Sequence, residues 1–245
     1  LLMPSTTRPV LGGVFGGGGM FGIGYAMGVI QGLGEAGISF DGAPLLGTSA
    51  GSWAAAAVAL RVDVQDLLAL KVPSFPNART GVLAAAAREL FGEQTCPTVK
   101  VCACALPRLK RTVFDGAEHP VADLVAASSA VPGLLAPHTI DGVRYVDGGV
   151  RSGTSVDFGP DAARIVVIAP LAGAMWGPFR RLVDKGMHNE IDRWKQRTNG
   201  EVTLFTPVEV AAHIAQNPRH LFDKGRALEA FYCGLEQAQS EGLTV

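Results

Sequence analysis

The sequence has no excess of charge of either sign and very little cysteine. Its 245 residues carry 21 basic and 22 acidic side chains, a formal net charge of -1. This balance gives no electrostatic basis for binding nucleic acid, so no nucleic-acid partner is expected. Four cysteines are too few at this length for a disulfide scaffold, and a cytoplasmic location is expected. Apolar residues make up 48% and charged residues 18%, which favours a compact globular chain over a disordered one.

The cysteines also give little basis for a metal site. Cys102 and Cys104 alternate within the strand-like stretch VKVCACALP, and we expect them to pack on one face of that strand. Together with Cys96 they have poor spacing for metal ligands. We therefore expect no metal and no other cofactor.

Residues 10–34 contain no charged residue at all. The segment is long enough to span a bilayer, but it holds eleven glycines, four of them consecutive at positions 16–19. Glycine is a poor residue for a helix interior, so we expect a buried strand, a glycine loop and a helix. Gly24, Gly28 and Gly32 share one face of that helix, and we expect them to let it lie close to the sheet.

Short apolar runs alternate with helical patterns along the chain, which predicts one mostly parallel sheet between helices. The expected strands are 9–15, 43–47, 97–106, 111–114, 142–150, 163–171 and 202–207. The expected helices are 22–37, 50–60, 81–90, 120–131 and 177–200, with two more at the end. The predicted fold class is α/β, a three-layer α/β/α sandwich. Residues 1–245 are expected to form a single domain.

Polar or glycine-rich sequences follow three of the predicted strands, where open α/β sheets place reactive groups. The first is Ser49, in the G-x-S-x-G pattern with Gly47 and Gly51. These glycines permit a sharp turn that exposes a nucleophilic hydroxyl at the start of a helix. The alternative is a serine that merely caps the helix at residues 50–60.

The second is the glycine loop at the start of the chain. The backbone N–H groups of Gly17, Gly18 and Gly19 have no Cβ atoms in their path and are candidates for an oxyanion hole. A nucleotide-binding reading competes with this, because Gly17, Gly19 and Gly22 also spell G-x-G-x-x-G and Asp41 follows at a suitable distance.

The third is Asp147, which follows a strand and precedes two glycines. A carboxylate can accept the serine proton directly if it lies about 2.6–3.2 Å away. The alternative for Asp147 is an ordinary Asp-Gly turn. A triad in α/β-hydrolase order would instead need a later histidine: His188, His213 or His220. None of the three stands in a glycine-flanked or strand-end context.

Four stretches resemble the patatin-like phospholipases: GGGGMFGIGYAMGVIQGL, GTSAGS, AASSAVPGLLAPHTIDGVRYVDGG and LFDKGRALEAFYCGLEQA. The resemblance implies a patatin-type fold without a catalytic histidine. It also implies that Ser49 is the nucleophile, Asp147 its base, and Gly17, Gly18 and Gly19 the oxyanion donors, with no metal required. The implied activity is hydrolysis of carboxylic esters of lipids through an acyl-enzyme, with a lipid or fatty-acyl ester as substrate.

Two departures from the family pattern favour an alternative. Phe21 stands where the family often has a basic residue, and SGTS at 152–155 replaces a sequence such as SPTN. We expect a weaker oxyanion site and a looser loop beneath Asp147. The alternative functions are a catalytically weak or inactive lipid-binding relative and, less favoured, a nucleotide-binding oxidoreductase.

Peripheral membrane contact is a further hypothesis. Residues 178–200 combine Trp194 with six basic and three acidic residues, a composition that fits contact with anionic lipid. An ordinary solvated helix face is the stronger interpretation. The sequence gives no oligomeric state.

Overall fold

The computed structural model describes residues 7–71, 73–173, 180–215 and 217–241. Within these residues, eight strands form one sheet. They are β1 (Leu11–Phe15), β2 (Leu45–Thr48), β3 (Val99–Ala105), β4 (Lys110–Asp115), β5 (His138–Ile140), β6 (Val143–Asp147), β7 (Arg164–Ile168) and β8 (Glu201–Phe205). The order is β5-β6-β3-β2-β1-β7-β8, and β4 also pairs with β3.

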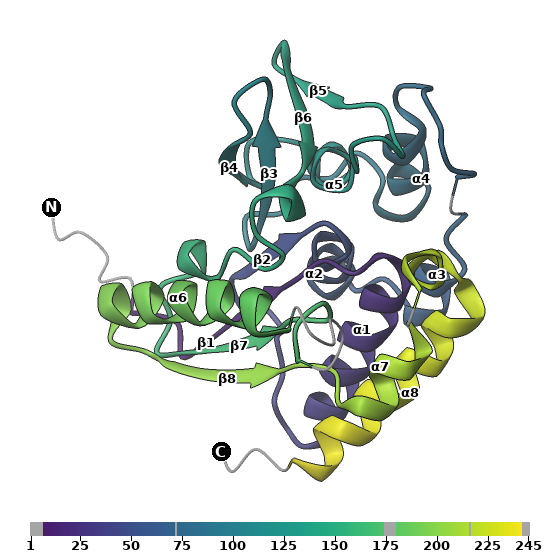
Figure 1. Cartoon of the computed structure of the whole chain (residues 1–245). Helices are drawn as coiled ribbons and strands as arrows, with labels where there is room; N and C mark the ends of the chain where they lie inside the picture. The colour runs from purple at the N-terminus through teal and green to yellow at the C-terminus, as the bar shows by residue number, and fades with distance from the viewer. Residues whose placement is uncertain (1–6, 72, 174–179, 216, 242–245) are drawn as a thin grey trace, which may run out of the picture.

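Helices lie on both faces of the sheet (Figure 1). They are α1 (Gly19–Glu35), α2 (Ala50–Leu60), α3 (Val64–Leu68), α4 (Val82–Phe91), α5 (Val121–Ser128), α6 (Arg180–Thr198), α7 (Glu209–Ile214) and α8 (Lys224–Ser240). Short 3-10 turns are η1 (Gly148–Val150), η2 (Val156–Phe158) and η4 (Pro218–Phe222). The predicted α/β/α fold class is confirmed. Strands β3, β2, β1, β7 and β8 pair in parallel. Strands β4, β5 and β6 extend the sheet beyond them through antiparallel pairs.

The two faces of the parallel strands bury different cores. On β7, Ile165 and Val167 face the side of α6, whereas Val166 and Ile168 face the side of α1 and α2. This alternation is the two-residue period of a strand that is buried on both faces. Each such side chain stabilises the fold by about 1.5–3 kcal/mol.

The glycine face of α1 packs against α8, which corrects the expectation that it faces the sheet. A Cβ at Gly24 would lie 2.0 Å from the carbonyl oxygen of Ala227, and one at Gly28 would lie 2.0 Å from that of Phe231. No side chain fits at such a separation, so these glycines let the two helix backbones approach closely.

Helix α6 covers the other face, and its tryptophan belongs to the core. The side chain of Trp194 is fully buried, and its Nε1–H donates to the carbonyl oxygen of Pro160 at 3.0 Å. The expectation that Trp194 takes part in an interfacial surface is therefore wrong, because the apolar face of α6 is turned inward. Arg180 and Arg181 belong to the same hypothesis, but their side chains lie outside the described part. No helix among the described residues has the length and apolar character needed to cross a bilayer.

The register of β3 explains how two distant segments meet. Strand β4 pairs along Lys100–Ala105 on one edge of β3. The other edge is shared, with β2 pairing as far as Thr48↔Cys102 and β6 pairing from Ala103↔Asp147 onward. Strands β2 and β6 run in opposite directions there, so their carboxyl ends meet beside β3. Ser49 follows β2, and Asp147 is the last residue of β6.

Candidate active site

Ser49 occupies a sharp turn between β2 and α2. Its backbone has φ 52° and ψ -125°, a region that residues with a side chain rarely adopt, and such strain is typical of functional turns. The Ser49 side chain forms no cap of α2. The helix-cap alternative therefore does not describe this serine.

The flanking glycines allow the turn because the strand and the helix approach each other closely. A Cβ at Gly47 would lie 2.3 Å from the Cα of Ser52, and one at Gly51 would lie 1.9 Å from the carbonyl oxygen of Phe15. Both contacts are with backbone, which cannot move aside. The G-x-S-x-G spacing is thus a steric requirement of this strand–turn–helix junction.

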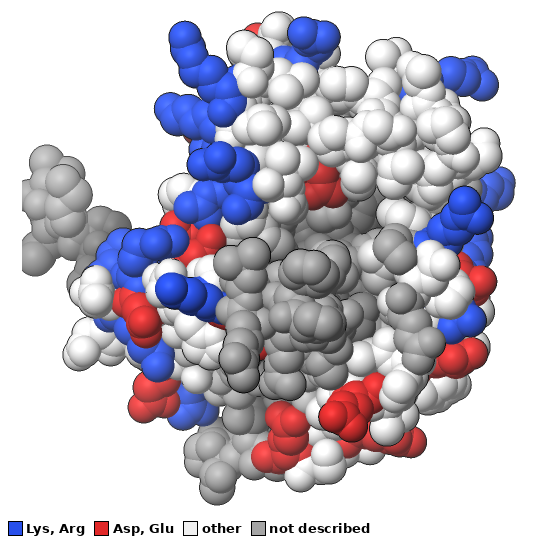
Figure 2. Space-filling view, in the orientation of Figure 1, with Lys and Arg blue, Asp and Glu red and all other residues white. Residues whose placement is uncertain are grey.

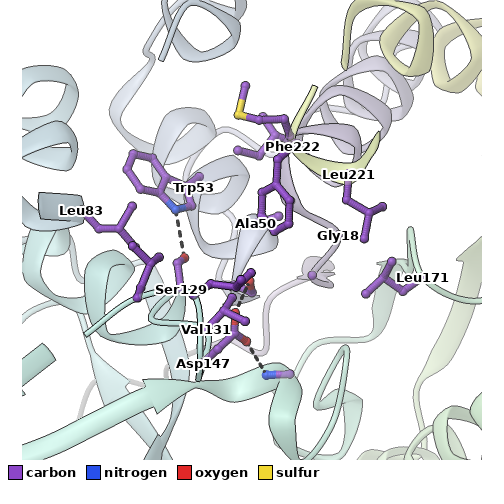
Figure 3. A pocket seen from close by; sticks show the side chains of 18 of the residues that line it. Gly18, Ala50, Trp53, Leu83, Ser129, Val131, Asp147, Leu171, Leu221 and Phe222 are labelled. Atoms are coloured by element: carbon purple, nitrogen blue, oxygen red, sulfur yellow. Dashed lines mark hydrogen bonds between the residues drawn. The ribbon is translucent and has the colours of Figure 1, made fainter. Parts of the chain in front are cut away.

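The hydroxyl of Ser49 donates to Oδ2 of Asp147 at 2.6 Å (Figure 3). Oδ1 of Asp147 accepts from the N–H of Gly149, also at 2.6 Å. The Asp147 side chain has no ion-pair partner among the described residues, and the residue is only 5% exposed. Burial raises the pKa of Asp147 to about 6, although the hydrogen bonds from Ser49 and Gly149 oppose the rise. A carboxylate with this pKa is ionised at neutral pH and is a stronger base than a solvated one.

A second serine supports the turn from β3 and α5. The N–H of Ser49 donates to Oγ of Ser128 at 2.7 Å, and the Ser128 hydroxyl donates to the carbonyl oxygen of Cys102 at 2.6 Å. Sequence reasoning did not single out Ser128. Its only signal was its place in the stretch that resembles the family, which does not say what it contacts.

The three loop glycines differ in what their N–H groups do. The N–H of Gly17 donates to the carbonyl oxygen of Gly153 at 2.8 Å, so it is not free to bind an oxyanion in this structure. Gly18 and Gly19 have φ values of 148° and 60°. Across the described residues, the N–H groups of these two have no protein acceptor. Of the three, Gly18 and Gly19 therefore remain as candidate loop donors.

A cavity of about 470 Å³ opens beside Ser49 and Asp147. Figure 3 shows apolar side chains around it, from α1, α2, α4, η4 and the loops between elements. Those lining it include Ile23, Trp53, Leu83, Val131, Leu221 and Phe222. The Nε1–H of Trp53 donates to Oγ of Ser129 at 3.0 Å, which fixes the ring at the wall. The cavity suits an apolar chain attached to a group that reacts at Ser49.

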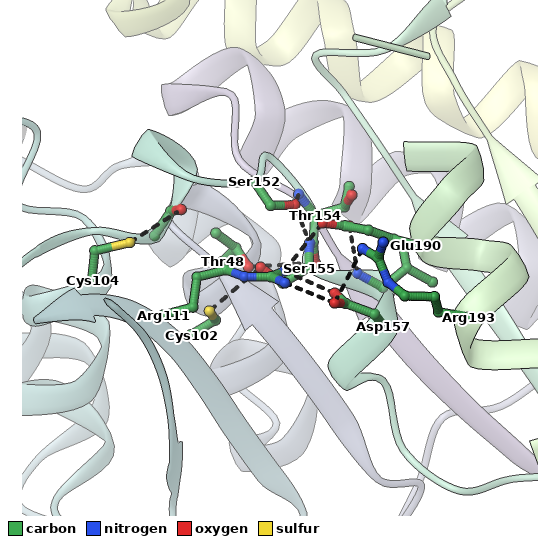
Figure 4. A network of polar contacts seen from close by, with 12 residues as sticks. Thr48, Cys102, Cys104, Arg111, Ser152, Thr154, Ser155, Asp157, Glu190 and Arg193 are labelled. Atoms are coloured by element: carbon green, nitrogen blue, oxygen red, sulfur yellow. Dashed lines mark hydrogen bonds and ion pairs between the residues drawn. The ribbon is translucent and has the colours of Figure 1, made fainter. Parts of the chain in front are cut away.

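The loop after Asp147 is held by a polar network on the α6 side of the sheet (Figure 4). Arg111 on β4 donates through both terminal nitrogens to the carboxylate of Asp157, at 2.7 and 2.8 Å, and also to Glu190 on α6. The N–H of Val156 donates to Glu190 at 3.0 Å. The expected looseness of the 152–155 loop is not observed, because these contacts and the Gly17–Gly153 hydrogen bond fix both of its ends.

The phenylalanine that departs from the family pattern is a core residue. Phe21 is fully buried and its ring stacks on that of Tyr25 at a centroid distance of 6.3 Å. A charged side chain at this depth would need a partner. The substitution therefore fits the apolar packing of α1.

The candidate histidines lie on α6, α7 and η4, and none takes the position that Asp147 occupies beside Ser49. Nδ1 of His188 lies 2.6 Å from the carbonyl oxygen of Asp184. Asp41, which the nucleotide-binding reading requires, forms an exposed ion pair with Arg61 at 3.2 Å. Within the described ranges, no three His, Cys, Asp or Glu side chains gather as a metal site would require.

Fold and site together define an α/β protein with a serine–aspartate pair at the carboxyl end of its parallel strands. The family model "Patatin-like phospholipase" matches residues 107–158, a segment that includes Asp147 but not Ser49. The resemblance to this family is thereby confirmed, and it supports lipid hydrolase chemistry in general terms.

Similarity to other known proteins is more remote. No curated protein matches the sequence. Among solved structures, VipD from Legionella pneumophila is similar, with 12% sequence identity and a TM-score of 0.48. That alignment covers 96% of this chain and 67% of the VipD chain.

Proposed function

We propose that the protein is a serine acyl hydrolase that cleaves carboxylic esters of lipids. The observation that carries the proposal is the 2.6 Å hydrogen bond from Ser49 to Asp147 at the wall of an apolar cavity. A serine hydroxyl is a weak nucleophile until a base removes its proton. Asp147 lies within reach of that proton, and its raised pKa increases its strength as a base.

The reaction follows from this arrangement. Asp147 accepts the proton as Oγ of Ser49 attacks the ester carbonyl carbon, and a negatively charged oxygen forms. The N–H groups of Gly18, Gly19 and Ala50 are the proposed donors to that oxygen, with Ala50 in the first turn of α2, where helix N–H groups have no partner within the helix. The intermediate expels the alcohol, which takes the proton from Asp147. Asp147 then takes a proton from water as the water oxygen attacks the acyl carbonyl carbon. The bond between that carbon and Oγ of Ser49 breaks, Oγ takes the proton back from Asp147, and the acid leaves.

Hydrolysis of p-nitrophenyl acyl esters tests the proposal. Ser49→Ala and Asp147→Asn should each abolish activity, because each removes a reacting group. Alanine at His188 or His213, which are exposed, should leave activity within about threefold, since surface substitutions away from reacting groups usually have small effects. His220 is half-buried beside the cavity residues Leu221 and Phe222, so His220→Ala should lower activity modestly but not abolish it. Loss of activity in one of the histidine variants, with retained folding, would support a conventional triad and contradict the serine–aspartate assignment.

A further inference from the structure

Four basic residues lie on or beside the antiparallel extension of the sheet. Arg108 and Lys110 lie in and after the turn between β3 and β4, Arg144 lies on β6, and Arg151 follows η1. All four are exposed, and none forms an ion pair with a carboxylate in the part of the chain that the structure describes. We call these four residues the basic edge.

Neighbouring charges do not neutralise the basic edge. Arg111 also lies on β4, but its charge is matched by Asp157 and Glu190. The acidic residue of the adjacent β5–β6 turn, Asp141, lies 3.7 Å from His119. Figure 2 shows Lys and Arg gathered at the upper left, over β3, β4 and β6, whereas most acidic side chains of this face lie lower, over α6 and along the bottom and lower right.

The basic edge stands at the same end of the sheet as the cavity. The last β2–β3 pair is Thr48↔Cys102, so β3 continues for three residues beyond the end of β2. At about 3.3 Å per residue, its turn lies about 10 Å past the level of Ser49. Arg151 directly follows Val150, which lines the cavity. A flat surface that contacted the basic edge would thus lie against the cavity mouth.

Exposed apolar side chains accompany these cations. Val143 on β6 is 40% exposed, and Val150 beside the cavity is 42% exposed. Cations interleaved with aliphatic groups match the charged headgroups and acyl boundary of an anionic bilayer. A nucleic acid would contact the cations with its phosphates and stack its bases on aromatic rings, so it would make no use of the two valines. We propose that the basic edge binds the anionic surface of a phospholipid bilayer and turns the cavity mouth toward the lipid. The role that we give to this contact, presenting the cavity to lipid, rests on the proposed function. Binding to the bilayer can be measured whether or not the protein hydrolyses esters.

Co-sedimentation with vesicles tests the docking directly. The whole chain should sediment with vesicles of phosphatidylcholine mixed with phosphatidylglycerol at low salt, and should be released at high salt. A triple variant with Arg108→Gln, Lys110→Gln and Arg144→Gln should bind about 100-fold more weakly, since each cation near an anionic surface contributes a factor of about five. The same triple should hydrolyse a soluble p-nitrophenyl ester at the wild-type rate.

A matched triple with Arg164→Gln, Lys185→Gln and Lys195→Gln removes the same charge from β7 and α6. It should bind vesicles within about threefold of wild type. Equal loss in the two triples, or no binding of the wild type at low salt, would overturn the docking proposal. The docking proposal would also be overturned if the wild type bound a single-stranded oligonucleotide as tightly as the mixed vesicles and the Arg108, Lys110 and Arg144 triple variant lost that binding.

The two proposals fail in distinguishable ways. Ser49→Ala should bind vesicles as the wild type does, because the nucleophile lies outside the basic edge. Vesicle binding by a wild-type protein that hydrolyses no ester would contradict the proposed function and support the docking. Ester hydrolysis by a wild-type protein that does not bind mixed vesicles would support the proposed function and contradict the docking.

Discussion

Asp147 and Asp157 stand at the two ends of one loop, and they occupy opposite environments. Asp147 is buried, has no cationic partner among the residues that the structure describes, and accepts hydrogen bonds from a serine hydroxyl and one backbone N–H. Asp157 accepts two hydrogen bonds from Arg111 and lies 3.3 Å from Arg193. Burial raises the pKa of Asp147 to about 6. Burial would also raise that of Asp157, but the hydrogen bonds from Arg111 outweigh it and the pKa is lowered.

The difference separates a carboxylate suited to chemistry from one suited to structure. A carboxylate held by a guanidinium is a weak base, because giving it a proton breaks a charge-assisted pair. A buried carboxylate without a cation gains from accepting a proton. The same loop thus combines the proposed base with the anchor that keeps it in place, and substitutions at its two ends should have contrasting effects.

The largest contrast is expected in activity. Asp147→Asn should lower kcat/KM for a p-nitrophenyl ester by about 10³-fold or more, because an amide cannot take the serine proton. Asp157→Asn should lower it less than about tenfold, since its carboxylate touches no reacting atom. Steady-state kinetics of the two purified variants compares them. A loss of similar size in both would mean that Asp157 is as necessary to the chemistry as Asp147.

The pH dependence of activity should report the pKa of Asp147. The base acts only when ionised, so kcat/KM should be level above pH about 6 and fall tenfold per unit below it. Activity is therefore lost as the pH decreases, never as it rises through this range. A pH–rate profile with a soluble ester measures the midpoint. A midpoint near 4, the value of a solvated carboxyl, would contradict the burial of the base.

Stability should change in opposite directions at the two aspartates. The folded pKa of Asp147 is raised, so the contribution of this group to stability is fully present below pH about 4 and is lost as the pH rises through about 6. Asp147→Asn should therefore stabilise the protein at pH 7.5 by about 1–3 kcal/mol. Asp157 has a lowered pKa, so its contribution is present above pH about 4 and is lost as the pH falls. Asp157→Asn should destabilise by about 2 kcal/mol, because Arg111 loses its bidentate partner.

Urea unfolding at pH 7.5 and pH 4 measures both effects. The gain from Asp147→Asn should disappear at the lower pH, where the wild-type side chain is protonated as well. If both variants changed the free energy of unfolding in the same direction at pH 7.5, the prediction that the two aspartates affect stability in opposite ways would be contradicted.

The smallest effect is expected within the loop itself. A Cβ at Gly153 would meet no atom within 4 Å, whereas one at Gly51 would meet backbone at 1.9 Å. Gly153→Ala should keep kcat/KM within about threefold and leave the melting temperature unchanged within about 2 °C. Gly51→Ala, as the matched control, should prevent stable folding. Gly153 also lines the cavity, so a large loss of activity from Gly153→Ala would contradict the expectation that the open space at this position is not needed for the reaction.

Much of this arrangement could be predicted because its signals are local. The valine-rich runs, the glycines around Ser49 and the Asp-Gly-Gly after β6 each depend on neighbours in the sequence. The serine and the aspartate were predicted to meet, and the distance between them agrees with that expectation. Their roles, like the single-domain organisation of residues 1–245, stay predictions.

The remaining features depend on contacts that no local pattern specifies. The N–H of Gly17 has the same freedom as those of Gly18 and Gly19 until the distant Gly153 accepts it. The glycine face of α1 indicates close packing but not its partner, and that partner proved to be α8. Trp194 is amphipathic in sequence, and only the fold decides that its ring is buried. Strand β5, at three residues, is too short to leave a periodic signal.

Labelling with a fluorophosphonate tests the central pair most directly, because the probe reacts only with a serine that a base has activated. Mass spectrometry of the wild-type protein at pH 7.5 should locate the probe on Ser49, and Asp147→Asn should slow labelling by about 100-fold or more. Undiminished labelling of Asp147→Asn, or a probe found on a serine other than Ser49, would contradict the account.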